Sequence, residues 1–188
     1  MRLFVALALP ESATSELARI LERFRRTAPE RGLRWVRAEG AHLTLRFLGE
    51  TDPAAVAALA SDLAAIAGRH AAIEATIGAT PGAFPPRGPA RVVWLDVAPH
   101  APIVALAGDV AAACESRLGL APEARPFTPH LTLARADPPW RRAEFEAWRE
   151  RVAAPGGIAV RFDRLSLVAS RLGPGGSRYA EVASAALG

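Results

Sequence analysis

The sequence predicts an α+β fold in which two similar lobes of mostly antiparallel sheet carry helices packed outside. The first observation is a repeat: the tetrapeptide His-Leu-Thr-Leu occurs at 42–45 and again at 130–133, so the copies begin 88 residues apart. The second is shared order, because an Asp-Pro pair that can open a helix follows each copy, at 52–53 and 137–138. The third is that strand-like and helix-like segments mix without strict alternation. We expect residues 1–188 to form one bilobal domain.

The first half of the chain alternates short strands with two helices. An apolar run at 3–9 predicts a strand buried on both faces, which Pro10 ends. A helix should follow, because Leu17, Leu21 and Phe24 fall on one stripe at helical spacing. Two further strands are expected over 33–36 and 42–48. A helix should then run from Asp52-Pro53 to about residue 67.

The second half of the chain contains four further segments with the composition of strands, which span 73–79, 91–97, 159–170 and 179–183. The stretch 81–89 holds too many prolines for regular structure. A helix over about 102–118 should end at Gly119 and lead into the second His-Leu-Thr-Leu strand. Another helix is expected to open at Asp137-Pro138, and the turn-rich segment 173–176 joins the last two strands.

Bulk composition excludes several classes of protein. The single cysteine, Cys114, excludes an intramolecular disulfide and a cysteine-based zinc site, and it favours a cytoplasmic location. No stretch approaches the ~20 apolar residues of a membrane span. The opening apolar run could pass for a short signal peptide, but it spans only 3–9 and Glu11 and Glu16 follow, so we expect a buried strand there. The formal net charge of +4, carried by arginine without lysine, leans toward polyanionic partners.

The repeated tetrapeptide places one imidazole and one hydroxyl on the same face of a strand. His42 and Thr44 share a face because strand side chains alternate, and His130 and Thr132 repeat that geometry. A neutral and a protonated imidazole on opposite sides of a phosphodiester form a general base and a general acid, each worth roughly 10²–10⁴-fold in rate. The threonine hydroxyls can donate hydrogen bonds to the non-bridging oxygens. This chemistry needs no metal or other cofactor, and we expect none.

Other interpretations of the motif are weaker. A histidine and a threonine on one strand face can be partly buried polar residues of a sheet, and a single copy would favour that interpretation. Two copies in matched contexts favour a functional pair. Zinc binding by His42 and His130 fits poorly, because no Asp or Glu stands at alternate-residue spacing beside either histidine.

Through these residues the chain resembles the RNA 2′,3′-cyclic phosphodiesterase family, also called the 2′-5′ RNA ligase family, of the 2H phosphoesterase superfamily. The paired His-x-Thr elements are the specific part of the resemblance, which extends over nearly the whole chain. The segments that carry it are Arg2–Ala6, Trp35-Val36, His42–Glu50, Phe84-Pro85, Val92–Leu95, Phe127–Arg135, Ser170–Leu172, Gly176 and Tyr179.

The resemblance implies an active site in a cleft between the lobes and hydrolysis of an RNA terminal 2′,3′-cyclic phosphate to a 2′-phosphate. It implies that His42 protonates the departing 3′ oxygen, that His130 activates water, and that Thr44, Thr132 and Arg135 hold the phosphate. The expected partner is an RNA with such an end, or a cyclic nucleotide, bound by a monomer. Reversible 2′-5′ ligation and a nucleotide- or RNA-binding module without turnover stay open as alternatives.

For three more residues, the question is whether the side chain lies on the same face of the strand as the histidine. Arg135 lies five residues past His130, so a regular strand would turn it to the opposite face, whereas a bulge would bring it round. Phe47 has the same spacing from His42; the family stacks a base there, and a core phenylalanine is the alternative. Arg46 shares the face of His42 in a regular strand, which makes it a further candidate for phosphate or substrate contact.

Overall fold

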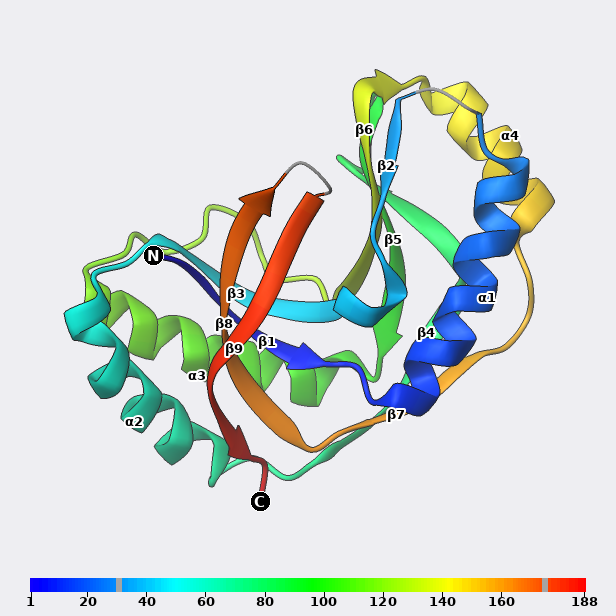
Figure 1. Ribbon diagram of the computed structural model, residues 1–188. Helices are drawn as coiled ribbons and strands as arrows, with labels where there is room; N and C mark the ends of the chain where they lie inside the picture. Colours follow the sequence, from blue (N-terminus) through cyan, green and yellow to red (C-terminus); the bar gives the residue numbers. More distant parts are fainter. Residues whose placement is uncertain (30–31, 174–175) are drawn as a thin grey trace.

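Two antiparallel sheets lie side by side and form two lobes (Figure 1), which confirms the predicted α+β class. The structure, a computed structural model, describes residues 1–29, 32–173 and 176–188. The first sheet has the strand order β3-β1-β8-β9 and the second the order β2-β6-β5-β4-β7. The strands are β1 (Arg2–Ala8), β2 (Leu33–Trp35), β3 (His42–Glu50), β4 (Ile73–Phe84), β5 (Ala90–Ala98), β6 (His130–Trp140), β7 (Gly157–Phe162), β8 (Arg164–Gly173) and β9 (Gly176–Ala186).

Each sheet is covered by two helices, so the apolar face of every helix closes one lobe. The helices are α1 (Glu11–Thr27), α2 (Val56–Ala67), α3 (His100–Leu118) and α4 (Arg142–Val152), with short 3₁₀ turns η1 (Ala38–Gly40) and η2 (Pro53–Ala55). Helices α2 and α3 pack on the first sheet and make the first lobe, while α1 and α4 pack on the second sheet and make the second lobe (Figure 1). The predicted stripe of α1 is fully buried, and its Phe24 meets Trp148 of α4 edge to face at 5.3 Å.

The chain passes repeatedly between the two lobes. Helix α1 follows β1 of the first sheet but packs on the second, and α3 follows β5 of the second sheet but packs on the first. The segment 119–129 then returns the chain from α3 to β6 of the second sheet. Each lobe therefore contains elements from both halves of the sequence.

The proline-rich stretch is more regular than the sequence predicts. Strand β4 continues through Pro81 to Phe84, although the prolines of 81–89 predict a lack of regular structure. Pro81 lacks an N–H, and the ladder accommodates it with a register shift between Ile77 and Pro81. The carbonyl of Pro81 is used outside the ladder, where it accepts a hydrogen bond from Arg149 at 2.9 Å.

The two Asp-Pro pairs do different things, so the expected second helix start is wrong. Asp52 caps as predicted, because its side chain accepts a hydrogen bond from the Ala54 N–H at 2.9 Å. Asp137 instead lies within β6, where its N–H donates to the Gly32 carbonyl at 2.7 Å. Strand β6 continues past the Asp-Pro pair to Trp140, which pairs with Ala90 of β5, and α4 begins only at Arg142.

The first of the last two predicted strands is two strands in the structure. The single run expected over 159–170 breaks at Asp163 into β7 of the second sheet and β8 of the first. The predicted turn at 173–176 has two residues, 174 and 175, outside the described part of the chain. None of the helices in the described ranges has the length and apolar character that crossing a membrane requires.

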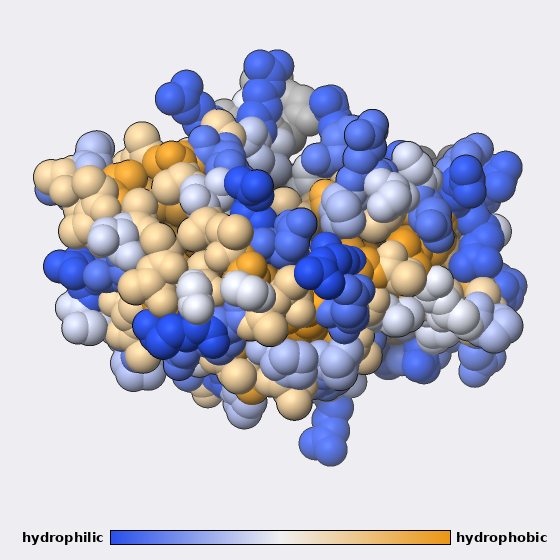
Figure 2. All heavy atoms as spheres, turned by 90° about the horizontal axis from the view of Figure 1, so that it is seen from below, coloured by the Kyte–Doolittle hydropathy of each residue, from blue (hydrophilic) through white to orange (hydrophobic). Residues whose placement is uncertain are grey.

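The outer side of α2 carries small side chains. Figure 2 views the molecule from below, where pale apolar spheres cover much of the left part, the part occupied by α2 in Figure 1. Exposed alanines of this helix include Ala57, Ala64 and Ala65. Because alanine exposes little area per residue, this surface is only weakly apolar.

Candidate active site

The two His-Leu-Thr-Leu elements form the first halves of β3 and β6, and these two strands contact each other across the lobes. His42 lies opposite Ala8 of β1, and His130 lies opposite Asp96 of β5. In both strands the histidine and the threonine are half-buried while the leucines are buried. The alternation predicted from the sequence therefore holds over the tetrapeptide in each lobe.

Each histidine is held by the same backbone contact. Nδ1 of His42 lies 2.8 Å from the carbonyl oxygen of Gly40, and Nδ1 of His130 lies 2.7 Å from that of Thr128, two residues back in both cases. A carbonyl oxygen can only accept, so Nδ1 carries the proton in both rings. Nε2 is then the nitrogen that accepts a proton in the neutral ring or donates one in the charged ring.

Aromatic rings fix the plane of each imidazole. His42 stacks on Phe4 with a centroid distance of 4.6 Å and meets the edge of Tyr179 at 5.0 Å. His130 meets Phe84 edge-on at 5.0 Å, and Phe84 stacks in turn on Trp94. These aromatic residues have no role that the sequence predicts, because their ring contacts join strands that are distant in the chain.

Burial shifts both histidines toward the neutral form. Loss of solvent lowers the pKa of His42, and the hydrogen bond to Gly40 opposes that change. Loss of solvent also lowers the pKa of His130, where the bond to Thr128 opposes it and the positive charge of Arg135 adds to it. Arg135 therefore lies close enough to His130 to act on its protonation.

A bulge at the same place in both strands resolves the parity question. In β3, Thr44 pairs with Ala6 and Arg46 pairs with Val5, which leaves Leu45 as an extra residue. Strand β6 repeats this at Leu133, because the residues on either side of it pair with two consecutive residues of β5. The residue five positions after each histidine thus returns to the histidine's face.

The bulges set the positions of Arg135 and Phe47. Arg135 is exposed on the face of His130 and Thr132 and shifts the pKa of His130, as the bulged alternative requires. Phe47 is 58% exposed, with its ring 6.0 Å from that of Phe4, so the alternative of a core phenylalanine is wrong. Phe47 in the first lobe and Arg135 in the second are therefore counterparts.

The same bulge makes the expectation for Arg46 wrong. Arg46 does not share the face of His42: it is turned to the helix side of the first sheet and is only 4% exposed. Its guanidinium contacts Glu115 of α3 at 3.3 Å and Glu123 at 2.8 Å. Parity counted along a regular strand fails here because Leu45 adds one residue that has no partner in β1.

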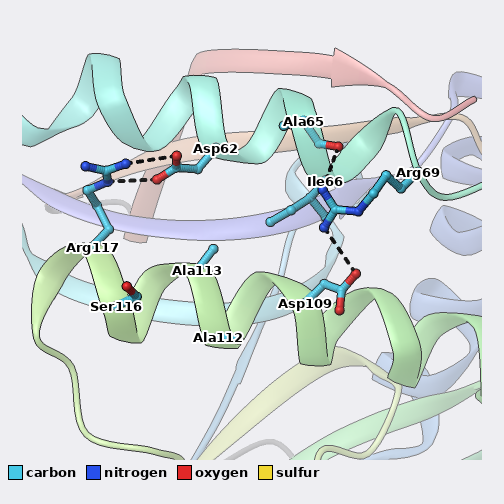
Figure 3. A pocket seen from close by; sticks show the side chains of 9 residues that line it. All are labelled: Asp62, Ala65, Ile66, Arg69, Asp109, Ala112, Ala113, Ser116 and Arg117. Carbon is cyan, nitrogen blue, oxygen red and sulfur yellow. Dashed lines mark hydrogen bonds and ion pairs between the residues drawn. The ribbon is translucent and has the colours of Figure 1, made fainter.

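A separate groove lies between α2 and α3, on the helix side of the first sheet (Figure 3). Its volume is about 550 Å³, and none of the predicted site residues lines it. Two ion pairs cross it, one between Arg117 and Asp62 at 2.7 Å and one between Arg69 and Asp109 at 3.5 Å (Figure 3). Over the described ranges, no group of three or more His, Cys, Asp or Glu side chains is placed to hold a metal ion.

Comparison with known proteins agrees with this geometry. Residues 10–174 match the family model of the 2′-5′ RNA ligase superfamily. An RNA 2′,3′-cyclic phosphodiesterase from Geobacillus stearothermophilus is 35% identical over 132 residues, which cover 70% of this chain and 41% of that protein. The chain thus matches less than half the length of that relative.

Solved structures match over almost the whole chain. The crystal structure of TT0787 of Thermus thermophilus gives a TM-score of 0.78 at 28% identity and covers 100% of this chain and 98% of that one. E. coli LigT complexed with 3′-AMP gives a TM-score of 0.72 at 28% identity over 99% of this chain and 97% of that one. The two-lobe fold, the duplicated motif and the family match agree, and the chain belongs to the 2′-5′ RNA ligase superfamily.

Proposed function

We propose that this protein hydrolyses the terminal 2′,3′-cyclic phosphate of RNA, or of a cyclic nucleotide, to a 2′-phosphomonoester by metal-independent acid–base catalysis. His130 accepts a proton from water through Nε2 while the water oxygen attacks phosphorus. The bond from phosphorus to the 3′ oxygen breaks, and His42 gives its Nε2 proton to that oxygen. The product carries a 2′-phosphate and a free 3′-hydroxyl.

One observation carries this proposal: two contacting strands each present a histidine with Nδ1 held by the carbonyl two residues back. Both rings are thereby set in the same tautomer with Nε2 as the exchanging nitrogen, which is what a paired base and acid require. The names of the relatives, which describe cyclic phosphodiesterases, agree with this chemistry.

The charges favour the assignment of roles. The positive charge of Arg135 disfavours the protonated form of His130, so His130 suits the base. His42 suits the acid, because the pKa of a buried imidazole rises when an anionic phosphodiester binds beside it. Thr44, Thr132 and Arg135 stabilise the charge that gathers on the non-bridging oxygens. Phe47 offers its exposed ring to the base of the last nucleotide.

The test is hydrolysis of an oligonucleotide with a 2′,3′-cyclic phosphate end in the presence of a chelator, with ³¹P NMR to separate the 2′- from the 3′-phosphate. His42→Ala and His130→Ala should each lower kcat by roughly 10²–10⁴-fold. His70→Ala is the matched control, because His70 pairs with Asp109 between α2 and α3. Full activity in either motif variant refutes the two-histidine mechanism.

Two other outcomes would change the assignment. Saturable nucleotide binding without any product would support a binding module rather than an enzyme. Joining of a cyclic phosphate end to an RNA 5′-hydroxyl would add 2′-5′ ligation, which is the same displacement with the 5′-hydroxyl attacking phosphorus in place of water and the same two histidines moving the protons. Because both motifs come from one chain, we propose that a monomer is active, and activity at protein concentrations too low for association checks this.

A further inference from the structure

We propose that Arg46 is a positioning residue: from the helix side of the first sheet it fixes the segment that delivers His130 to the site. This inference rests on the proposed function, since it concerns how the second histidine is placed for that reaction. Arg46 is buried and is turned away from the motif face. It acts through the segment 119–129, which connects α3 on the first sheet to β6 in the second sheet.

Two of the three contacts of Arg46 lie on that segment, and the third lies on α3 just before it. Its Nη2 donates to the carbonyl oxygen of Ala121 and lies 3.3 Å from Glu115, near the end of α3. Its Nη1 lies 2.8 Å from Glu123. The side chain is 4% exposed, whereas Glu123 is 63% exposed. One buried guanidinium on β3 therefore holds both the end of α3 and the first part of the connection to β6.

The far end of the same segment positions His130. Thr128, whose carbonyl oxygen accepts the hydrogen bond from His130 Nδ1, belongs to this connection. A displacement of the segment would move that carbonyl and with it the tilt of the imidazole. A shift of about 1 Å at a reacting group can cost about 10²-fold in rate. Arg46 thus links the strand that carries His42 to the placement of His130.

The second lobe indicates that the fold itself does not need an arginine at this position. Counting from each histidine, the counterpart of Arg46 is Ala134, which is completely buried beside the matching bulge. Burying a guanidinium is costly unless charged and hydrogen-bonded partners compensate. The guanidinium donates to one carbonyl and lies within ion-pair distance of two carboxylates through two separate nitrogens, whereas a lysine has to reach all three groups from a single nitrogen. The partners that compensate the charge are the very groups that anchor the connection.

The experiment compares Arg46→Met and Arg46→Lys with the matched control Arg117→Met. Arg117 also lies at the end of α3 and pairs with Asp62 of α2 at 2.7 Å (Figure 3), but its contact has no link to 119–129. The readouts are kcat and KM on a 2′,3′-cyclic phosphate end, the pH dependence of kcat, and hydrogen exchange of residues 119–127. Glu123→Gln serves as a milder variant if Arg46→Met does not fold.

We expect Arg46→Met to lower kcat by about 10- to 100-fold with a much smaller change in KM, because the histidine rather than the substrate contact is displaced. Arg46→Lys should recover part of kcat, and exchange at 119–127 should rise in the order wild type, Lys, Met. The limb of the pH profile that reports His130 should move in the same order. The control should leave all three readouts unchanged.

The inference and the proposed function fail differently. An inactive wild-type protein contradicts the proposed function and leaves hydrogen exchange to judge the contact between Arg46 and the segment. An active wild type with a folded Arg46→Met variant of equal kcat and equal pH profile overturns the positioning role. The same conclusion follows if Arg46→Met fails to fold and both Arg46→Lys and Glu123→Gln keep the wild-type kcat and exchange pattern.

Discussion

Replacing Phe47 by alanine should weaken substrate binding without slowing the chemical step. Phe47 is 58% exposed, so truncation removes little buried area. Full burial of a phenylalanine is worth roughly 1.5–3 kcal/mol, and scaling that by the buried fraction gives a folding cost of ~1 kcal/mol. The variant should therefore stay folded at room temperature and allow a clean kinetic comparison.

The size of the kinetic effect follows from base stacking. A base stacked on an aromatic ring contributes roughly 1–3 kcal/mol, which corresponds to a roughly 5- to 150-fold rise in KM. Since the base is the same in the ground state and the transition state, kcat should change little. Phe47→Trp should keep KM within a few-fold of the wild-type value because a larger ring still stacks.

The assay compares a nucleoside 2′,3′-cyclic phosphate with ribose 2′,3′-cyclic phosphate, which has no base. Phe47→Ala should raise KM only for the nucleoside substrate. Val104→Ala is the control, because Val104 is another exposed apolar side chain, on α3. An unchanged KM for the nucleoside substrate, or an equal loss on both substrates, would refute the stacking argument.

Further predictions concern pH, the thiol and a crowded glycine. Burial lowers the pKa values of His42 and His130 from the usual 6.5. The free protein with one neutral and one charged imidazole is therefore most populated below pH 6.5, and kcat/KM should peak there. A maximum of kcat/KM above about pH 7 contradicts the assignment. For the same reason the unfolded chain binds more protons, so the free energy of unfolding should fall as pH drops below 6.5, which urea titrations measure. Burial raises the pKa of Cys114 to about 11, so Ellman's reagent should react only after unfolding, and prompt labelling of the native protein would sink this expectation. A Cβ on Gly82 would lie 2.6 Å from the Trp94 ring, so Gly82→Ala should lower the melting temperature and alter tryptophan fluorescence; an unchanged spectrum and melting temperature would count against that packing.

The regular parts of the fold were predictable because local periodicity dominates there. The buried stripe of α1 and the alternation within each tetrapeptide follow from spacing alone. The sequence could not tell the two Asp-Pro pairs apart, because the hydrogen bond from Asp137 to Gly32 depends on a segment about a hundred residues earlier. The dipeptide is the same in both places, and the tertiary partner decides between a cap and a strand.

The bulges explain which site residues the sequence could assign. His42 and His130 could be singled out from the repeat, but the face of any residue beyond Leu45 or Leu133 depends on the register with β1 or β5. That register is set by the neighbouring strand. Counting alternate residues from the histidine therefore leaves the face of Arg135 undecided and assigns Arg46 to the wrong face. Residues 115, 121 and 123, which surround Arg46, carry no sequence signal that connects them to β3.

The exchange of helices between the lobes bears on how the protein meets its ligand. Two lobes that move about a single hinge are usually joined by one or two linkers. Here each lobe contains strands and helices from both halves of the sequence, so the chain crosses between the lobes several times. A large opening motion would have to bend all of these connections at once. We expect the distance between the two lobes to change little on binding, so that selectivity depends on whether a ligand fits a preformed site.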